Sequence, residues 1–400
     1  MDGVRGAAPQ WAPRAAPAMN EDKSARYHRL KRRAEIASVG WTTVLLAALL
    51  WSGAAQALRD GVLAVTASAS LAVVLYVLCL AVLHEAGALP IAFYAGHLLE
   101  HRYGVSRQSL GQWLLDHGKA ATLGLAIGVL IASIVYALMR ALPSWWWLAA
   151  GAAVSAFLVI VATLAPVILL PLFFRCEPLD TPSLRQRLER LAERAGARVV
   201  GVFRWDLGEK TTKANAALTG IGSTRRILIA DTMLAHYSED EIEVVLAHEL
   251  AHHVHGDIWT GIVYETALTL AGFYAAHRLL SAAAPSLGLT GVADPAGLPL
   301  LVLAAGGVSL VLMPVALAIS RGHERRADRF ALDLTGNPAA FISAMRRLGA
   351  QNLAEERPSR IVQWLFYSHP PLAERLDAAA RWHVTEGGTE ASAAVEAPRP

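Results

Sequence analysis

Six apolar segments, each long enough to cross a lipid bilayer as a helix, constrain this chain more than any other feature. They lie near residues 38–58, 62–83, 120–141, 146–174, 258–282 and 298–319. A bilayer core about 30 Å thick requires about 20 residues at 1.5 Å each. Hydrophobic residues make up 54% of the 400 residues and charged residues only 17%, which excludes an ordinary soluble domain. The sequence therefore predicts a polytopic α-helical membrane protein with about six transmembrane helices.

The distribution of positive charge predicts how these helices are oriented. Lys and Arg are frequent in residues 1–36, an Ala- and Pro-rich beginning that we expect to be a disordered basic tail. Because positively charged segments stay in the cytoplasm, the N-terminus is expected there, and six crossings return the C-terminus to the same side. Residues 175–257 and 320–400 are then both cytoplasmic. A signal peptide is not expected, because the first apolar segment begins too far into the chain.

Composition also narrows the partners and the location of the protein. The net charge of +3 is too small to indicate a nucleic-acid partner, and two cysteines supply neither a disulfide framework nor a thiolate zinc site. The abundance of Ala, Arg and Gly suggests a GC-rich bacterial gene. We therefore expect a multi-pass protein of the bacterial inner membrane, surrounded by the lipid bilayer.

One motif in the soluble part of the chain carries recognisable chemistry. His248, Glu249 and His252 form an HExxH pattern, in a segment that begins with a capping box of Ser238 and Glu241. Residues four apart lie on one helix face, so both histidines can bind one Zn²⁺, and Glu249 can take a proton from a water that the metal activates. The alternative is a surface helix with ordinary histidines, and the cap and helical flanks count against it.

A third metal ligand is expected beyond the last apolar segment. Glu324 and Asp328 are four residues apart and share a face of the helix that this stretch predicts. Glu324 would complete a His₂Glu zinc site with an open position for water, and Asp328 would orient a ligand histidine from behind. In isolation, the same run is also consistent with a solvated charged face that pairs Arg325 with Asp328.

Two further residues are candidates for contacts with a substrate. Residues 198–205 and 226–230 predict strands, and the polar Asn215 between them indicates an exposed edge that can hold an extended peptide. A plain structural strand is equally consistent with this pattern. His369 precedes two prolines, so it either donates to a developing oxyanion or marks the start of a helix over 371–382.

A second histidine pair is not expected to bind zinc. The stretch from His97 to His101 formally matches the inverted zinc motif HxxEH, with Glu100 as its acidic residue. It has no evident third ligand, and a histidine pair on an amphipathic segment at the membrane surface is more often simply solvated.

Together these motifs resemble the type I CAAX prenyl protease family of integral-membrane zinc endopeptidases. The resemblance covers roughly residues 85–382 and includes the HExxH motif, Asn215-Ala216, Ile229 to Leu234, Ser320 to Asp328, and Ser368 to Pro371. It implies a gluzincin fold that binds one Zn²⁺ per chain. The family's ligands correspond to His248, His252 and Glu324, and its general base and acid corresponds to Glu249.

The resemblance also assigns roles to the remaining candidates. It implies that Asp328 lies behind the metal ligands, Asn215 on the substrate-binding edge strand, and His369 near the tetrahedral intermediate. In that family the membrane helices surround a large chamber below the catalytic domain, and prenylated C-terminal peptides are cut near the cytoplasmic face. The related bacterial peptidase HtpX shares the zinc motifs and degrades membrane proteins.

We therefore expect a zinc metalloendopeptidase that acts on peptide or protein substrates, possibly membrane-anchored or lipidated. A quality-control protease similar to HtpX is the first alternative, and a non-catalytic zinc-stabilised membrane scaffold is the second. The expected organisation is a disordered tail (1–36), a membrane domain of four helices (37–174) with a cytoplasmic amphipathic segment (84–119), an α+β metallopeptidase domain (175–382) interrupted by two transmembrane helices, and a disordered tail (383–400).

Overall fold

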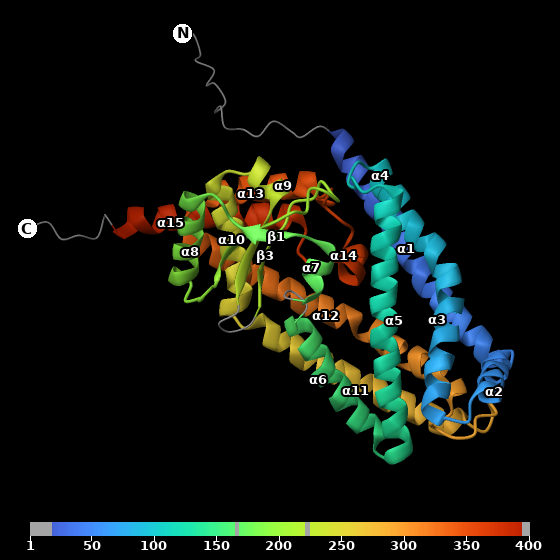
Figure 1. Cartoon of the computed structure of the whole chain (residues 1–400). Helices are drawn as coiled ribbons and strands as arrows, with labels where there is room; N and C mark the ends of the chain where they lie inside the picture. The colour runs from blue at the N-terminus through green and yellow to red at the C-terminus, as the bar shows by residue number, and fades with distance from the viewer. Residues whose placement is uncertain (1–17, 165–167, 221–224, 394–400) are drawn as a thin grey trace, which may run out of the picture.

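The computed structural model describes residues 18–164, 168–220 and 225–393, in which long helices carry a small mixed domain at one end (Figure 1). Five helical stretches of this part are long and apolar enough to cross a membrane: Lys23–Trp51, Ala69–Arg102, Leu110–Ala141, Trp146–Leu164 and Pro295–Thr335. The prediction of a polytopic helical membrane protein with an α+β domain is confirmed. A further long helix, α11 (Asp257–Ala283), packs against α6 and α12 and corresponds to the predicted span 258–282.

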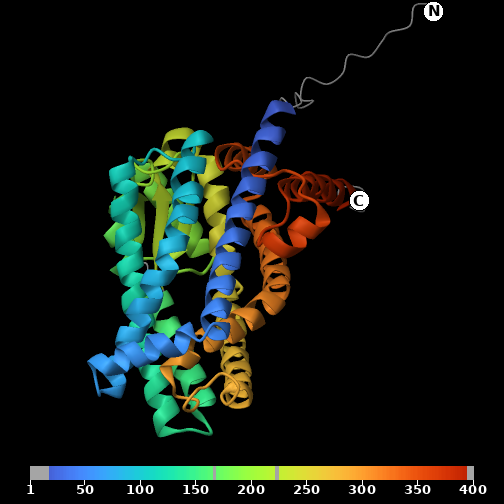
Figure 2. The ribbon, with the colours of Figure 1, turned by 90° about the vertical axis from the view of Figure 1, so that its right-hand side faces the viewer.

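The N-terminal helix α1 (Ala18–Trp51) begins well before the first predicted span. The prediction of a disordered tail is therefore wrong for residues 18–36, and residues 1–17 lie outside the described residues. The basic stretch is ordered because its side chains pair with groups that are distant in the sequence, as Lys31 does with Glu100. Figure 2 shows α1 running along most of the molecule, and it packs against both α3 and α12.

The predicted surface segment 84–119 does not exist as a separate element. The chain instead forms, in order, α2 (Ala54–Val65), α3 (Ala69–Phe93), the π-helical turn η1 (Tyr94–Leu98), α4 (Leu99–Arg102), α5 (Leu110–Ala141) and α6 (Trp146–Leu164). One long rod continues through the π-turn as far as Arg102, and a capping box at Ser109 starts the next one. Polar residues in this stretch thus belong to the ends of membrane helices.

The small domain is built on a four-stranded sheet of order β1-β2-β4-β3. Its strands are β1 (Cys176–Pro178), β2 (Gly201–Trp205), β3 (Ala216–Thr219) and β4 (Arg226–Ala230). The β2 and β4 strands are parallel and the two outer pairs are antiparallel. Because β3 pairs only with β4 in the described sheet, its other side is an open edge, and it lies next to α10.

Five helices of the described part bury one apolar core with this sheet: α8 (Pro182–Arg194), α9 (Asp231–His236), α10 (Glu239–Val254), α13 (Pro338–Gln351) and α15 (Leu372–Ala393). Two shorter helices, α7 (Leu170–Phe173) and α14 (Arg360–Phe366), have no buried residues. Leu188 and Leu191 of α8 and Ile227 and Ile229 of β4 are fully buried, and each contributes about 1.5–3 kcal/mol of burial free energy. Since α15 continues to Ala393, the predicted start of the C-terminal tail at residue 383 is wrong, and residues 394–400 lie outside the described part.

One continuous helix extends from the membrane region into the small domain. The α12 helix (Leu298–Thr335) follows a short 3₁₀ turn, η4 (Pro295–Gly297), and runs without interruption past Pro314. The sequence predicts a span that ends near residue 319 and a separate helix from Ser320, but the two form one rod. A left-handed Gly336, with φ of 61°, ends it.

A buried ion pair holds the loop between α11 and α12 against α2. The Asp294 side chain is 0% exposed, lies 2.5 Å from Arg59 Nη1, and accepts a hydrogen bond from the Ala296 main chain. Asp60 also pairs with Arg59, but its side chain is 65% exposed. The inner carboxylate is therefore the partner on which this contact depends.

We expect Asp294→Ala to destabilise the protein by about 3–5 kcal/mol, because it leaves the Arg59 guanidinium without its buried partner. Thermal unfolding of the full chain in detergent measures the loss. Asp60→Ala is the matched control and is expected to change stability by less than about 1 kcal/mol. Equal effects of the two variants would contradict this assignment.

Candidate metal centre

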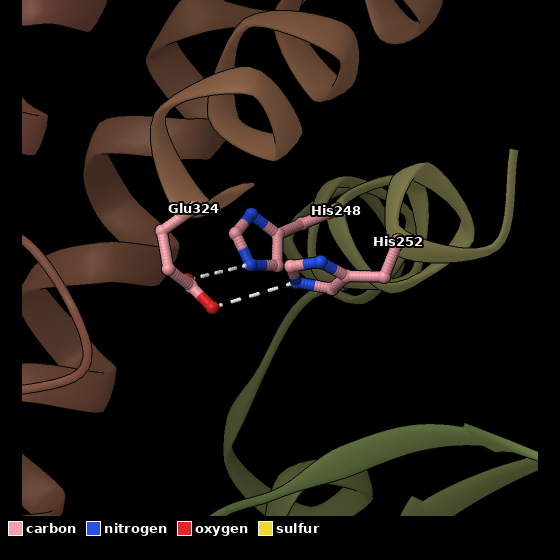
Figure 3. A group of neighbouring side chains, drawn as sticks. All are labelled: His248, His252 and Glu324. Carbon is pink, nitrogen blue, oxygen red and sulfur yellow. Dashed lines mark ion pairs between the residues drawn. The ribbon is translucent and has the colours of Figure 1, made fainter. Parts of the chain in front are cut away.

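The α10 helix presents two histidines to the C-terminal part of α12. Its first turn is fixed by the predicted capping box, in which Ser238 accepts from the Glu241 main chain and Glu241 accepts from the Ser238 main chain. His248 and His252 then follow one helical turn apart and face Glu324 of α12 (Figure 3). The α10 and α12 helices pack along each other, so these side chains are held by rigid elements.

The three side chains converge on one point. One ligand atom from each of His248, His252 and Glu324 lies within 4.8 Å of the other two. His248 Nε2 is 3.2 Å from Glu324 Oε2, and His252 Nε2 is 3.5 Å from Glu324 Oε1. Ligands about 2.1 Å from a tetrahedral Zn²⁺ lie about 3.4 Å apart. The spacing of the nitrogen and oxygen atoms therefore matches a zinc site.

Glu324 carries a second sign that a cation belongs here. Its Oε2 atom is buried and has no hydrogen-bond partner among the described residues, although His248 Nε2 is nearby. A buried carboxylate oxygen without a partner is costly, and a metal ion between it and the imidazoles removes that cost. Two imidazoles and one carboxylate form a donor set that suits Zn²⁺.

Each histidine is held through its other ring nitrogen by a carboxylate. His248 Nδ1 lies 2.9 Å from Asp328 Oδ1, and His252 Nδ1 lies 2.9 Å from Asp257 Oδ2. Donation from Nδ1 fixes the tautomer that leaves Nε2 free to bind a metal. Asp328 thus lies against His248, and Asp257 takes the equivalent position against His252.

Asp257 was not found from the sequence because a turn places it. Gly256, with φ of 66°, ends α10 and reverses the chain, so the first residue of α11 returns toward His252. Arg326 Nη2 lies 2.7 Å from the second oxygen of Asp257 and holds it in place. The one local signal is an acidic residue immediately after the glycine that ends the HExxH helix.

Arg375 is a second residue that the sequence did not indicate. It donates to both oxygens of Asp328, from Nη2 at 2.5 Å and from Nε at 2.8 Å, and its Nη2 is 3.4 Å from His248 Nδ1. A bidentate guanidinium fixes the plane of the carboxylate that orients His248. Arg375 lies on α15, which starts after the prolines that follow His369, so only the tertiary fold brings it to the ligands.

The surroundings shift the pKa values of Glu249 and His248. Burial raises the pKa of the Glu249 carboxyl above its ordinary value, against the opposing effect of His248 and His252. A carboxyl group with a raised pKa is a better proton acceptor near neutral pH. Burial lowers the pKa of His248, but the neighbouring carboxylates of Asp328 and Glu324 outweigh burial and raise that pKa to about 9.

The remaining predicted residues share a cavity with the motif. Asn215, His248, Glu249 and His369 line a space of about 380 Å³ between the start of β3 and the start of α15. His369 Nε2 lies 3.3 Å from Glu324 Oε1, and the side chain is 59% exposed. Asn215 is exposed directly before the edge strand. All the candidate residues are thus found at one site.

The pair His97 and His101 does not take part in a comparable cluster. Glu100 between them turns to Tyr27 and Lys31. Over the described residues, the one grouping of three His, Cys, Asp or Glu side chains with metal-binding spacing is His248, His252 and Glu324.

Comparison with known families decides which kind of protein carries this centre. The model of Peptidase family M48 matches residues 178–383, and the model described as CAAX prenyl protease N-terminal, five membrane helices, matches residues 13–175. The chain belongs to peptidase family M48. The resemblance to CAAX prenyl proteases is confirmed, and the M48 chain is a membrane protease.

Individual relatives span most of the M48 chain. The uncharacterized metalloprotease YhfN of Bacillus subtilis is 28% identical over 337 residues, which are 83% of this chain and 79% of that protein. CAAX prenyl protease 1 of Saccharomyces cerevisiae is 30% identical over 319 residues, or 72% and 68% of the two chains. The crystal structure of S. mikatae Ste24p has a TM-score of 0.81 and 23% identity over 92% of both chains, and so has the same fold.

Asp257→Ala is expected to weaken zinc binding about 10- to 100-fold, because the His252 ring loses the carboxylate that orients it. Competition with a chelator at constant pH measures the affinity. Asp333→Ala is a suitable control, since Asp333 accepts a hydrogen bond from Trp382 and does not contact the ligands. If Asp257→Ala bound zinc as tightly as the control, His252 would not depend on this carboxylate.

Proposed function

We propose that this chain is a membrane-embedded zinc metalloendopeptidase that hydrolyses peptide bonds with Glu249 as general base. The observation that carries the proposal is the convergence of His248, His252 and Glu324 beside the cavity that His248 and Glu249 line. A metal site that only stabilises a fold has no need of a free carboxylate beside its ligands. The same cavity reaches an open strand edge, which a peptidase needs and a scaffold does not.

His248, His252 and Glu324 would hold the metal, with Asp328 and Asp257 orienting the two imidazoles. When bound, Zn²⁺ supplies Lewis acidity toward water and the peptide carbonyl, and it keeps a coordination position open. Glu249, with its raised pKa, accepts the proton of the attacking water and returns it to the leaving amine. The role of the protein is thus to place one proton carrier beside the reacting bond.

Two further groups would act on the substrate. His369 faces the ligand cluster through Nε2, while Ser368 Oγ lies 2.8 Å from its Nδ1. A ring in that position donates to the oxyanion that forms on the substrate carbonyl. Asn215 and the outer edge of β3 hold the substrate as an added strand.

The substrates that fit this architecture are membrane-anchored or lipidated peptides. The N-terminal end of α1 and the small domain lie at the same end of the membrane helices (Figure 1). With the basic N-terminal region on the cytoplasmic side, the catalytic site also faces the cytoplasm, at the inner membrane of a bacterium. Cleavage of a prenylated C-terminus, as in the CAAX proteases, is the first candidate reaction. Degradation of misfolded membrane proteins, as in HtpX, is the second candidate reaction.

Glu249→Gln is expected to retain zinc and to lose about 10²–10⁴-fold in kcat, because the amide cannot accept a proton. The measurement is cleavage of one membrane-anchored peptide, prenylated and unprenylated, by the purified protein in detergent. Glu243→Gln is the matched control, since Glu243 lies on the same helix and pairs with Arg187 outside the cavity.

Cleavage that survives in Glu249→Gln would contradict the assignment of the base. The prenyl comparison separates the substrate readings. A marked preference for the prenylated peptide supports processing of a defined substrate, and equal rates support the quality-control alternative.

A further inference from the structure

The short helix α14 carries an apolar face that is largely uncovered in the described part of the chain. The side chain of Ile361 is 71% exposed, that of Trp364 is 55% exposed, and the helix has no buried residue. The two residues are three apart, so they share one face of the helix. Adjacent large apolar groups that are this exposed indicate a surface with a binding partner.

The attachment of α14 to α12 gives the depth of this face. The two helices pack together, and Arg321 of α12 donates to the main-chain oxygens of Gln363, at 3.2 Å, and Tyr367, at 2.7 Å. Arg321 follows the apolar run of α12 by two residues, since that run ends at Ile319. The α14 helix is therefore attached where α12 passes from apolar to charged residues.

The bond from Arg321 fixes α14 at this level. Its guanidinium is buried, and the two oxygens that it binds lie at the C-terminal end of α14, where a cation is favourable. In Figure 1, α14 lies between α13, at the far end of the small domain, and the apolar part of α12. The exposed apolar surface of α12 extends toward the same level, because Val311 is 76% and Val315 is 50% exposed.

The N-terminal end of α14 is basic. Arg357 and Arg360 are both exposed, and neither has a hydrogen-bond or ion-pair partner among the described residues. Glu356 is the one acidic residue from position 356 to position 366, and the preceding Glu355 is paired with Arg32. Arg360 and Trp364 are four residues apart, so a guanidinium and an indole lie on the same face of the helix.

This combination fits the boundary between water and hydrocarbon in a lipid bilayer. Tryptophan is enriched at that boundary, and short helices with apolar and basic side chains lie in its plane. Arginines beside anionic headgroups gain a favourable interaction. A surface that faced water would instead leave Ile361 and Trp364 hydrated, at the level where the membrane-spanning part of α12 ends.

We propose that α14 lies in the interfacial layer of the bilayer on the side of the small domain. Ile361 and Trp364 insert between acyl chains, while Arg357 and Arg360 bind anionic headgroups. The contact is independent of the proposed peptidase chemistry. It has a consequence for the candidate site, because His369 follows α14 by three residues, so lipid and Arg321 together hold the segment that carries this histidine.

A fluorescent label at the face of α14 tests the lipid contact in the full-length protein in vesicles. Trp364→Cys, in a background of Cys79→Ala and Cys176→Ser, is labelled with the fluorophore NBD. The label should lose most of its emission when the acyl chains carry a nitroxide quencher, and it should resist aqueous dithionite. A label at Ile361→Cys should behave in the same way.

Arg346→Cys is the matched control, because Arg346 is exposed on α13, remote from the apolar part of α12. Its label should keep its emission in nitroxide lipid and lose it to dithionite. If the label at position 364 behaved like this control, α14 would face water. If it resisted both reagents, protein such as a second copy of the chain would cover α14. Either result would overturn the proposal.

The headgroup contact is tested by the class of lipid that carries the quencher. Nitroxide-labelled phosphatidylglycerol, as a minor component of phosphatidylcholine vesicles, should quench the label at position 364 more than nitroxide-labelled phosphatidylcholine does. The expected local enrichment is up to about 5-fold for each arginine. Arg357→Gln combined with Arg360→Gln should make the two lipids equal, while Arg346→Gln should not. Equal quenching with both arginines present, or a preference that survives their removal, would contradict the assigned headgroup contact.

Discussion

A buried carboxylate facing two imidazoles is the interaction on which this structure depends. Glu324 is buried in the C-terminal part of α12, and one of its oxygens has no hydrogen-bond partner in the described part of the chain. Such an arrangement is unfavourable unless a cation occupies the gap between Glu324 and the histidines of α10. We therefore expect a metal ion bound here to stabilise the packing of α10 against α12.

The continuity of α12 extends this constraint into the membrane region. The helix that supplies Glu324 is apolar over most of its length before it reaches the ligands. The apolar stretch and the ligand residue thus belong to one continuous helix. The α1 helix packs against α12 and lines the cavity with His28. Access to the metal is therefore shaped by membrane helices as much as by the catalytic domain.

Local patterns in the sequence were sufficient for the first half of the site. Helical spacing alone puts His248 with His252 and Glu324 with Asp328, and the capping box at Ser238 fixes where α10 begins. The strand β4 was also predictable, since its run of Ile, Leu and Ala is bounded by polar residues. Each of these features depends on residues within one or two turns of each other.

The features that the sequence did not reveal all depend on long-range contacts. Asp257 reaches His252 only through the reversal at Gly256, and Arg375 reaches Asp328 from a helix 47 residues later in the chain. The basic residues of α1 have the composition of a solvated tail, and their order depends on Glu100, in a different helix. Composition describes the charge of a segment but not the partner that neutralises it.

The most direct test of the account is X-ray absorption spectroscopy at the zinc edge on the purified full chain, wild type beside Glu324→Gln. A His₂Glu site predicts stoichiometric zinc with two imidazole ligands and further oxygen ligands near 2.0–2.2 Å, and no sulfur scatterer near 2.3 Å. Glu324→Gln should lose metal or change the oxygen shell. A sulfur ligand, or an identical zinc environment in the two proteins, would contradict the ligand set on which every other conclusion about the site rests.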